Sequence, residues 1–320
     1  MAAPAVRADP LTRVDAIKAR GFLTCGLHAD FPGLAVIDAA DRAVGFEADL
    51  CRAVAAAVLG ADRVKFVAVQ TAAEFLLSPD TDVVFRGLSW TFTRELTSGM
   101  GFGPVYFHDG QTFLVRSQSG ARGAGDLAGT TVCVAAATHF ASALDEYARS
   151  GAARLVALPT ADRAGAYAAF LAGRCAAVTD DATELFAFAA GHEPDRFTIL
   201  PERISDEPLA GVVRRGDEDL LTVLRWTVFA VIAAEELGLT AASVDDAARA
   251  RSPAAAAFLA LPASAVLGLE VGWTRAVIRA VGNYGEIYRR NFARPGGADL
   301  PRGRNELSTH GGLLYAPPLH

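Results

Sequence analysis

The chain has 320 residues, which is room for two domains with a large buried core. Apolar residues make up 52% of it, charged residues 21%, and the formal net charge is −6. This acidic balance, without long Lys/Arg runs, argues against nucleic acid and anionic membrane surfaces as partners. The longest apolar stretches, 226–234 and 254–261, are too short to span a bilayer, so we expect no membrane-spanning segment.

Short apolar strands alternate with helices in two similar units. In chain order, we expect strands at 22–27, 64–68 and 83–86 with a helix at 47–58, and then strands at 131–134, 154–157 and 176–178 with helices at 141–149 and 163–171. This alternation predicts an α/β fold in which each unit has a mixed, mostly parallel sheet flanked by helices. Ligands of such sheets bind in the loops after the strands, here 27–33, 87–94, 135–140 and 179–183.

Two segments connect the units. The first is 105–110, and the second is 205–209, which precedes an extended stretch at 210–214 and a helix at 217–237. Two crossings predict that the second unit is inserted into the first. We therefore expect one lobe from 1–108 and 209–320 and another from 109–208, joined by a two-segment hinge.

One charged residue follows a strand in each unit. Arg94 ends the polar loop after the strand at 83–86, and Asp181 follows the strand at 176–178. An arginine offers a planar fork that fits a carboxylate, whereas an aspartate fits an ammonium. Facing one cleft, the pair would bind a zwitterion, which means an α-amino acid. Two surface charges near strand ends are the alternative.

Four cysteines divide two and two between the units and form no CxxC pair, so a zinc site is not indicated. This distribution suits one disulfide per lobe, Cys25–Cys51 and Cys133–Cys175, in an oxidising compartment. Four buried free thiols are the alternative. The histidines have no metal-ligand spacing and no phosphate loop is present, so neither a metal nor another cofactor is expected.

The N-terminus leaves the compartment open. The chain does not begin with a charged segment followed by an apolar stretch, the pattern of a signal peptide. Ala5-Val6-Arg7-Ala8 nevertheless has the small-x-small shape of a cleavage-site remnant. A periplasmic or other extracytoplasmic location and a cytoplasmic one both remain possible.

Longer stretches resemble the periplasmic amino-acid-binding proteins of ABC transporters, which have the type II solute-binding fold, and within them the general L-amino-acid-binding subfamily. The resemblance covers nearly the whole chain. It is carried by 16–26, 49–58, Ser89-Trp90-Thr91 with Arg94, 173–175, 234–238, 282–287 and 311–318.

The resemblance implies a role for each matched residue. Arg94 would clamp the ligand α-carboxylate, helped by Ser89, Thr91 and the backbone near Gly87. Thr138 would hold the same carboxylate from the second lobe, and Asp181 would accept the α-ammonium. The side-chain pocket would be lined by Trp90, His28, Asp30, Phe31 and Phe46.

The chain departs from the family pattern in the loop at 135–140, where the family usually has glycine and then threonines. Ala137 stiffens this loop, and His139 and Phe140 are bulky. Asp180 places a second carboxylate beside Asp181, which raises one of the two pKa values unless a cation lies nearby. We predict that His139, facing both carboxylates, shapes ligand choice without catalysing a reaction.

Two functions follow from these observations. The first is a monomeric binding protein that captures an L-amino acid and delivers it to an inner-membrane ABC permease. The alternative is a cytosolic enzyme on the same scaffold, of the dehydratase or lyase type, acting on an amino acid or a related carboxylate. The absent signal sequence and the unusual 137–140 loop motivate this alternative.

Overall fold

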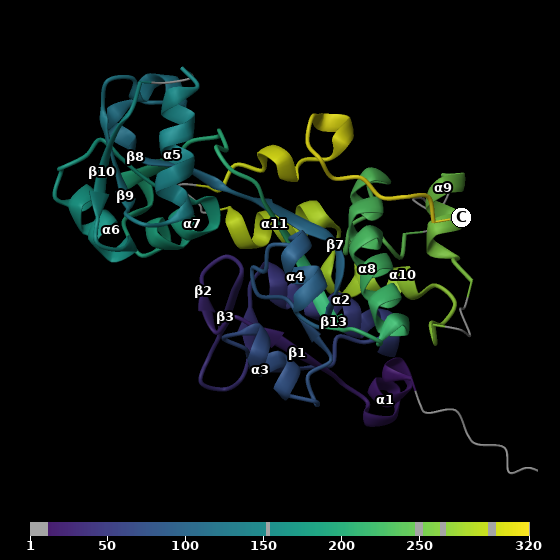
Figure 1. Cartoon of the computed structure of the whole chain (residues 1–320). Coiled ribbons are helices and arrows are strands. Elements are labelled where there is room, and N and C mark those ends of the chain that lie inside the picture. Colours follow the sequence, from purple (N-terminus) through teal and green to yellow (C-terminus); the bar gives the residue numbers. More distant parts are fainter. Residues whose placement is uncertain (1–11, 152–153, 247–251, 263–266, 294–298, 320) are drawn as a thin grey trace, which may run out of the picture.

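The computed structural model describes residues 12–151, 154–246, 252–262, 267–293 and 299–319 (Figure 1). The possible cleavage-site remnant at 5–8 lies outside these ranges. Within them, the longer strands form two five-stranded sheets flanked by helices, which confirms the predicted α/β class. The elements of the second sheet gather at one end of the molecule, where Figure 1 draws them in teal.

The first sheet has the strand order β5-β1-β6-β13-β7. Strand β1 pairs in parallel with β5 and β6, and β13 pairs antiparallel with β6 and β7. Four of its five strands therefore run in one direction, as the alternation of strands and helices predicts. The bounds are β1 Leu23–Leu27, β5 Val64–Ala68, β6 Val83–Val84, β7 Met100–Asp109 and β13 Glu207–Arg214.

The second sheet repeats this arrangement in the order β10-β9-β11-β8-β12. Strand β9 pairs in parallel with β10 and β11, and β8 pairs antiparallel with β11 and β12. The bounds are β8 Gln111–Arg116, β9 Thr131–Ala135, β10 Val156–Thr160, β11 Ala177–Asp181 and β12 Phe197–Ile199. Asp180 and Asp181 thus end a strand rather than occupying the predicted loop.

Helices cover both sheets, and their apolar faces supply most of the core. Around the first sheet, α2, α8 and α10 pack against one another. The first-sheet helices are α1 Arg13–Arg20, α2 Phe46–Leu59, α3 Ala72–Leu77, α4 Phe92–Thr97, α8 Glu218–Glu236, α9 Pro253–Leu259, α10 Trp273–Val281 and α11 Tyr284–Phe292. The second-sheet helices are α5 His139–Arg149, α6 Arg163–Leu171 and α7 Ala182–Ala190. A small sheet of β2 Asp30–Phe31, β3 Ala35–Ile37 and β4 Ala43–Val44 lies beside α2.

The chain crosses between the sheets twice. Strand β7 ends at Asp109 and β8 begins at Gln111, and the return runs from the end of β12 to the start of β13 at Glu207. The C-terminal segment holds the first crossing, because the Asn305 side chain bonds both the N–H and the C=O of His108, at 2.7 and 3.0 Å. The loops that follow the strands of both sheets meet near these crossings.

Both predicted disulfides are present, Cys25–Cys51 beside the first sheet and Cys133–Cys175 beside the second. No helix in the described ranges is long and apolar enough to cross a membrane. The same ranges contain no group of three or more His, Cys, Asp or Glu side chains arranged for a metal ion.

Candidate ligand-binding site

Arg94 lies in the first turn of α4, which buries none of its residues. The hydroxyl of Thr91 caps this helix by accepting the Arg94 backbone N–H at 3.3 Å. The guanidinium donates to the backbone carbonyl of Ser89 at 2.8 Å and has no ion-pair partner among the described residues. An arginine held by one backbone contact, with most of its fork unused, is suited to a ligand carboxylate.

Gly87 and Phe31 lie side by side. Gly87 has a φ of +62°, and its N–H donates to the buried carboxyl of Glu47 at 2.6 Å. A Cβ at this glycine would lie 3.9 Å from the Phe31 ring, which places the ring against the loop. The Glu47 carboxyl also accepts the hydroxyl of Tyr106. Burial raises the pKa of Glu47 to about 7. The two hydrogen bonds lower this pKa, but by less than burial raises it.

His28 and Asp30 lie in the segment that leads to Phe31. The Asp30 N–H donates to Nδ1 of His28 at 3.4 Å, and the His28 ring meets the Phe31 ring edge to face with centroids 5.8 Å apart. Burial, and then the charge of Arg86, lower the pKa of His28. The uncharged ring is therefore favoured, which suits a hydrogen-bonding pocket wall. Ligand contacts by His28, Asp30, Phe31 and Gly87 stay predictions.

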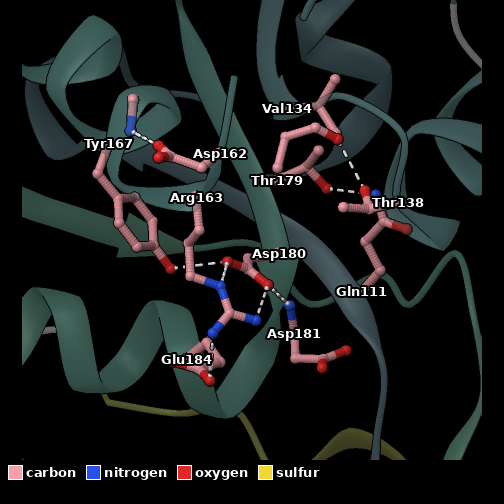
Figure 2. A network of polar contacts seen from close by, with 12 residues as sticks. Gln111, Val134, Thr138, Asp162, Arg163, Tyr167, Thr179, Asp180, Asp181 and Glu184 are labelled. Carbon is pink, nitrogen blue, oxygen red and sulfur yellow. Dashed lines mark hydrogen bonds and ion pairs between the residues drawn. The ribbon is translucent and has the colours of Figure 1, made fainter. Parts of the chain in front are cut away.

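Asp180 is engaged inside the second unit (Figure 2). Arg163 of α6 donates to both of its oxygens, at 2.7 and 3.1 Å, and the hydroxyl of Tyr167 donates at 3.0 Å. Arg163 also pairs with Glu184 at 2.6 Å. Asp180 is only 3% exposed and its oxygens are engaged by these contacts; its predicted part in ligand binding stays a prediction. It braces the end of β11.

Asp181 has no such partners. Its Oδ1 is buried and accepts no hydrogen bond from the part of the chain that the structure describes, and in Figure 2 its carboxylate lies apart from the Arg163 network. Burial, together with the charges of Asp109, Asp180 and Glu207, raises its pKa to about 9. The expected effect of neighbouring carboxylates is thus confirmed, although burial and Asp109 act more strongly than Asp180. A bound cation would remove this repulsion, which is what an α-ammonium supplies.

The 135–140 loop begins α5 and shows why the family prefers glycine there. Ala137 has a φ of +54°, a left-handed conformation that glycine adopts more easily. The hydroxyl of Thr138 donates to the Ala135 carbonyl at 2.7 Å and caps α5. Gln111 ties the loop to β11 by donating to the Phe140 carbonyl and to the Thr179 hydroxyl, at 3.0 and 2.9 Å.

Glu207 is a site residue that the sequence analysis missed. It begins β13 at the second crossing, directly opposite Asp109 in the ladder with β7. Its carboxylate accepts the Ser89 hydroxyl at 2.5 Å and lies 3.8 Å from Nε2 of His139. His139 therefore faces Glu207 rather than the predicted partners Asp180 and Asp181. Only the strand register brings these residues together, so no local sequence signal identifies Glu207.

Two predicted pocket residues are engaged in aromatic contacts. Phe46 is fully buried in an aromatic cluster with Tyr106, Phe107 and Phe292, so it does not line the pocket. The Trp90 ring stacks on Phe102, and its Nε1 donates to Glu95 at 2.8 Å. It lines a different cavity of about 700 Å³ between β7, α8 and the C-terminal segment. The prediction for Phe46 is therefore corrected, whereas a ligand contact by Trp90, which is 37% exposed, stays a prediction.

Two mixed sheets joined by two crossings, with loops of both sheets meeting there, define a two-lobed solute-binding protein of type II. The chain belongs to family 3 of the bacterial extracellular solute-binding proteins, whose family model matches residues 23–241. This membership supports an extracytoplasmic location. It gives no support to the enzyme alternative, because the family consists of binding proteins.

Similar proteins match along nearly the whole chain. The general L-amino acid-binding periplasmic protein AapJ of Rhizobium johnstonii is 36% identical over 316 residues, 96% of this chain and 93% of that protein. The glutamate/glutamine/aspartate/asparagine-binding protein BztA of Rhodobacter capsulatus is 36% identical over 326 residues, 99% and 96% of the two chains. A solved periplasmic binding protein from Brucella ovis with glutathione bound is 34% identical, covers 97% of this chain and 100% of its own, and has a TM-score of 0.77.

Proposed function

We propose that this protein captures an L-amino acid between its two lobes and delivers it to an inner-membrane ABC permease. The proposal rests on two residues of opposite charge, one beside each sheet. Among the described residues, the Arg94 guanidinium has one backbone hydrogen bond and no ion-pair partner, and Oδ1 of Asp181 is buried without a hydrogen-bond donor. A zwitterionic α-amino acid supplies the missing partner of each. The names of the relatives AapJ and BztA support the same ligand class.

Capture requires the lobes to approach one another around the ligand. We propose that 1–108 with 209–320 and the inserted 109–208 are the moving bodies, with the two crossings as the hinge. A ligand that contacts Arg94 and Asp181 together stabilises the closed state, because neither residue gains its partner otherwise. We also propose that the protein acts as a monomer, since one chain contributes both halves of the site.

Glutathione is a second candidate ligand, favoured by the Brucella ovis structure. Its γ-glutamyl end carries a free α-carboxylate and a free α-ammonium, so the same two residues would bind it. The peptide remainder would then occupy the side-chain region near His28 and Phe31.

Isothermal titration calorimetry with the twenty proteinogenic L-amino acids and glutathione tests the proposal. We expect at least one L-amino acid to bind with Kd below about 100 µM, or about −5.5 kcal/mol. Tight binding of glutathione alone would select the second candidate. Binding of none of these solutes would contradict the proposed ligand class.

A further inference from the structure

The C-terminal segment, residues 299–319, lies beyond the stretch that the family model matches and contacts both crossings between the lobes. In the first crossing, the buried amide of Asn305 accepts the N–H of His108 and donates to its C=O. A neighbouring strand would form the same pair of bonds, so Asn305 completes the edge of β7 at this point. In the second crossing, Arg304 forms an ion pair with Asp206. Two consecutive residues thus hold one crossing each.

The C-terminal segment is itself fixed to the first lobe. Arg302 donates to both carboxylate oxygens of Glu235 on α8, at 2.6 and 3.1 Å. The same guanidinium donates to the backbone carbonyl of Asn305, at 2.8 and 3.1 Å. Arg304 lies between these two anchored residues, so its backbone keeps a defined position relative to α8.

Each crossing has one residue between the bonded parts of the two lobes, Gly110 in the first and Asp206 in the second. Toward the first lobe, the ladder of β7 with β13 reaches the residues directly next to both. Toward the second lobe, Gln111 donates its N–H to the Ser205 hydroxyl at 2.9 Å and accepts the N–H of Ile204 at 2.8 Å. Rotation of one lobe against the other is therefore concentrated at Gly110 and Asp206.

The two hinge residues are restrained in different ways. Gly110 has a φ of +149°, and a Cβ there would lie 2.3 Å from the Ser205 carbonyl oxygen, so only glycine lets the crossings touch. Asp206 is restrained through its side chain, which is 74% exposed and pairs with Arg304. Because Arg304 is fixed on the first lobe, a rotation of the backbone at Asp206 moves the carboxylate away from its partner.

The ion pair belongs to the lobe arrangement that the structure describes. Within the described residues, neither Arg94 nor Thr138 forms a hydrogen bond or an ion pair with the opposite lobe. The capture proposed above brings these two residues onto one ligand by moving the lobes toward one another. Such a movement rotates the backbone at Asp206, so it works against the Arg304–Asp206 pair.

We propose that the Arg304–Asp206 ion pair is a restraint on the hinge that stabilises the described arrangement against closure, while Asn305 holds the first crossing in place. The inference rests on the proposed two-lobed capture and adds the contact that sets the balance between the arrangements. An exposed ion pair contributes modestly, so its loss should change the ratio of the two arrangements by about two- to fivefold.

Spin-label distances between the lobes, measured by pulsed electron paramagnetic resonance on the ligand-free protein, test the proposal. The labels are placed at Thr93→Cys on α4 and Asp145→Cys on α5, which are both exposed. The four native cysteines are all in disulfides, so only the new thiols react. Closure shortens this distance, because the two helices begin at the proposed ligand residues of the two lobes. In Arg304→Gln we expect the population at shorter distances to rise about two- to fivefold.

A charge swap separates pairing from the mere loss of an arginine. Arg304→Asp combined with Asp206→Arg restores the pair in reverse and should return the population to within about 1.5-fold of wild type. Arg279→Gln breaks a similarly exposed pair with Asp245 on α10 and should leave the population unchanged. An unchanged population in Arg304→Gln, an equal rise in Arg279→Gln, or a swap that behaves like Arg304→Gln would overturn the proposal. Because no ligand is added, this result is independent of the calorimetric panel, which tests the ligand class alone.

Discussion

Arg94 and Asp181 are expected to bind the two ends of one ligand, yet their surroundings differ. Arg94 lies on a six-residue helix that buries none of its residues and is held by one contact to a backbone carbonyl. Asp181 ends a buried strand, next to an aspartate that is fully bonded to Arg163 and Tyr167. In the proposed site, the carboxylate-binding half can therefore adjust to its ligand, whereas in the ammonium-binding half burial and neighbouring carboxylates favour the uncharged form of Asp181 until a cation pairs with it.

This difference indicates what the ligand does in each half. Near Arg94 the ligand would add hydrogen bonds to a guanidinium that is already solvated. The arginine therefore contributes little to the stability of the ligand-free protein. Near Asp181 it supplies the cation that the ligand-free protein lacks. We therefore propose that binding relieves the electrostatic cost at Asp181 and forms new hydrogen bonds at Arg94.

Replacing Arg94 should give the largest effect, on binding alone. Arg94→Ala should lower the affinity for an L-amino acid by roughly 3 kcal/mol, over a hundredfold, because the ligand carboxylate loses a bidentate partner. The free energy of unfolding without ligand should change by less than about 0.5 kcal/mol, because α4 buries no residue. Calorimetry and urea denaturation measure the two quantities, with Arg149→Ala at the exposed end of α5 as control. Affinity within about threefold of wild type would contradict the assignment.

Replacing Arg163 should have the opposite pattern, with its main effect on stability. Arg163→Ala leaves the buried Asp180 with the Tyr167 hydroxyl and one backbone N–H. We expect a loss of about 2 kcal/mol in the free energy of unfolding, less than for a fully buried pair because the arginine is 43% exposed. Combining it with Asp180→Asn should recover part of the loss, since the buried Asp180 charge is then removed and only the partly exposed Glu184 still lacks its arginine. An unchanged urea midpoint in Arg163→Ala would show that Asp180 does not depend on this partner.

The smallest expected effect is a pH dependence of stability that comes from Glu47, the carboxyl bonded to Gly87 in the first half of the site. Burial raises the pKa of Glu47 to about 7, above its ordinary value of 4.5, so the folded protein binds this proton more tightly than the unfolded chain does. The resulting stability is present below pH 4.5 and is lost as the pH rises through 7. Glu47→Gln should flatten this decline by about 1 kcal/mol between pH 5 and 6, measured by urea denaturation without ligand. An equal flattening in Glu146→Gln would show that the decline has another origin.

The sequence predicted the elements of the fold and the disulfides better than it predicted the contacts around the candidate site. Periodicity located the strands and helices of both units, and the two-and-two distribution of cysteines gave both disulfides. The ion pair of Asp180 with Arg163 was not foreseen, because Arg163 lies 17 residues earlier on α6 and only the packing of that helix brings the two together. Glu207 was missed because its neighbours Ser89 and His139 are far away in sequence. The stacking of Trp90 on Phe102 could not be foreseen either, because the two rings meet only once β7 is in place beside the loop.

The central claim is that Arg94 and Asp181 each recognise a different end of one amino acid. Calorimetry with L-glutamate, with 4-aminobutyrate, which lacks the α-carboxylate, and with glutarate, which lacks the ammonium, tests it most directly. Arg94→Ala should reduce the preference for glutamate over 4-aminobutyrate at least about tenfold and leave its preference over glutarate. Asp181→Asn should reduce the preference for glutamate over glutarate at least about tenfold and leave the preference over 4-aminobutyrate unchanged. If both variants reduce both preferences equally, the two residues do not divide the ligand between them, and the account is wrong.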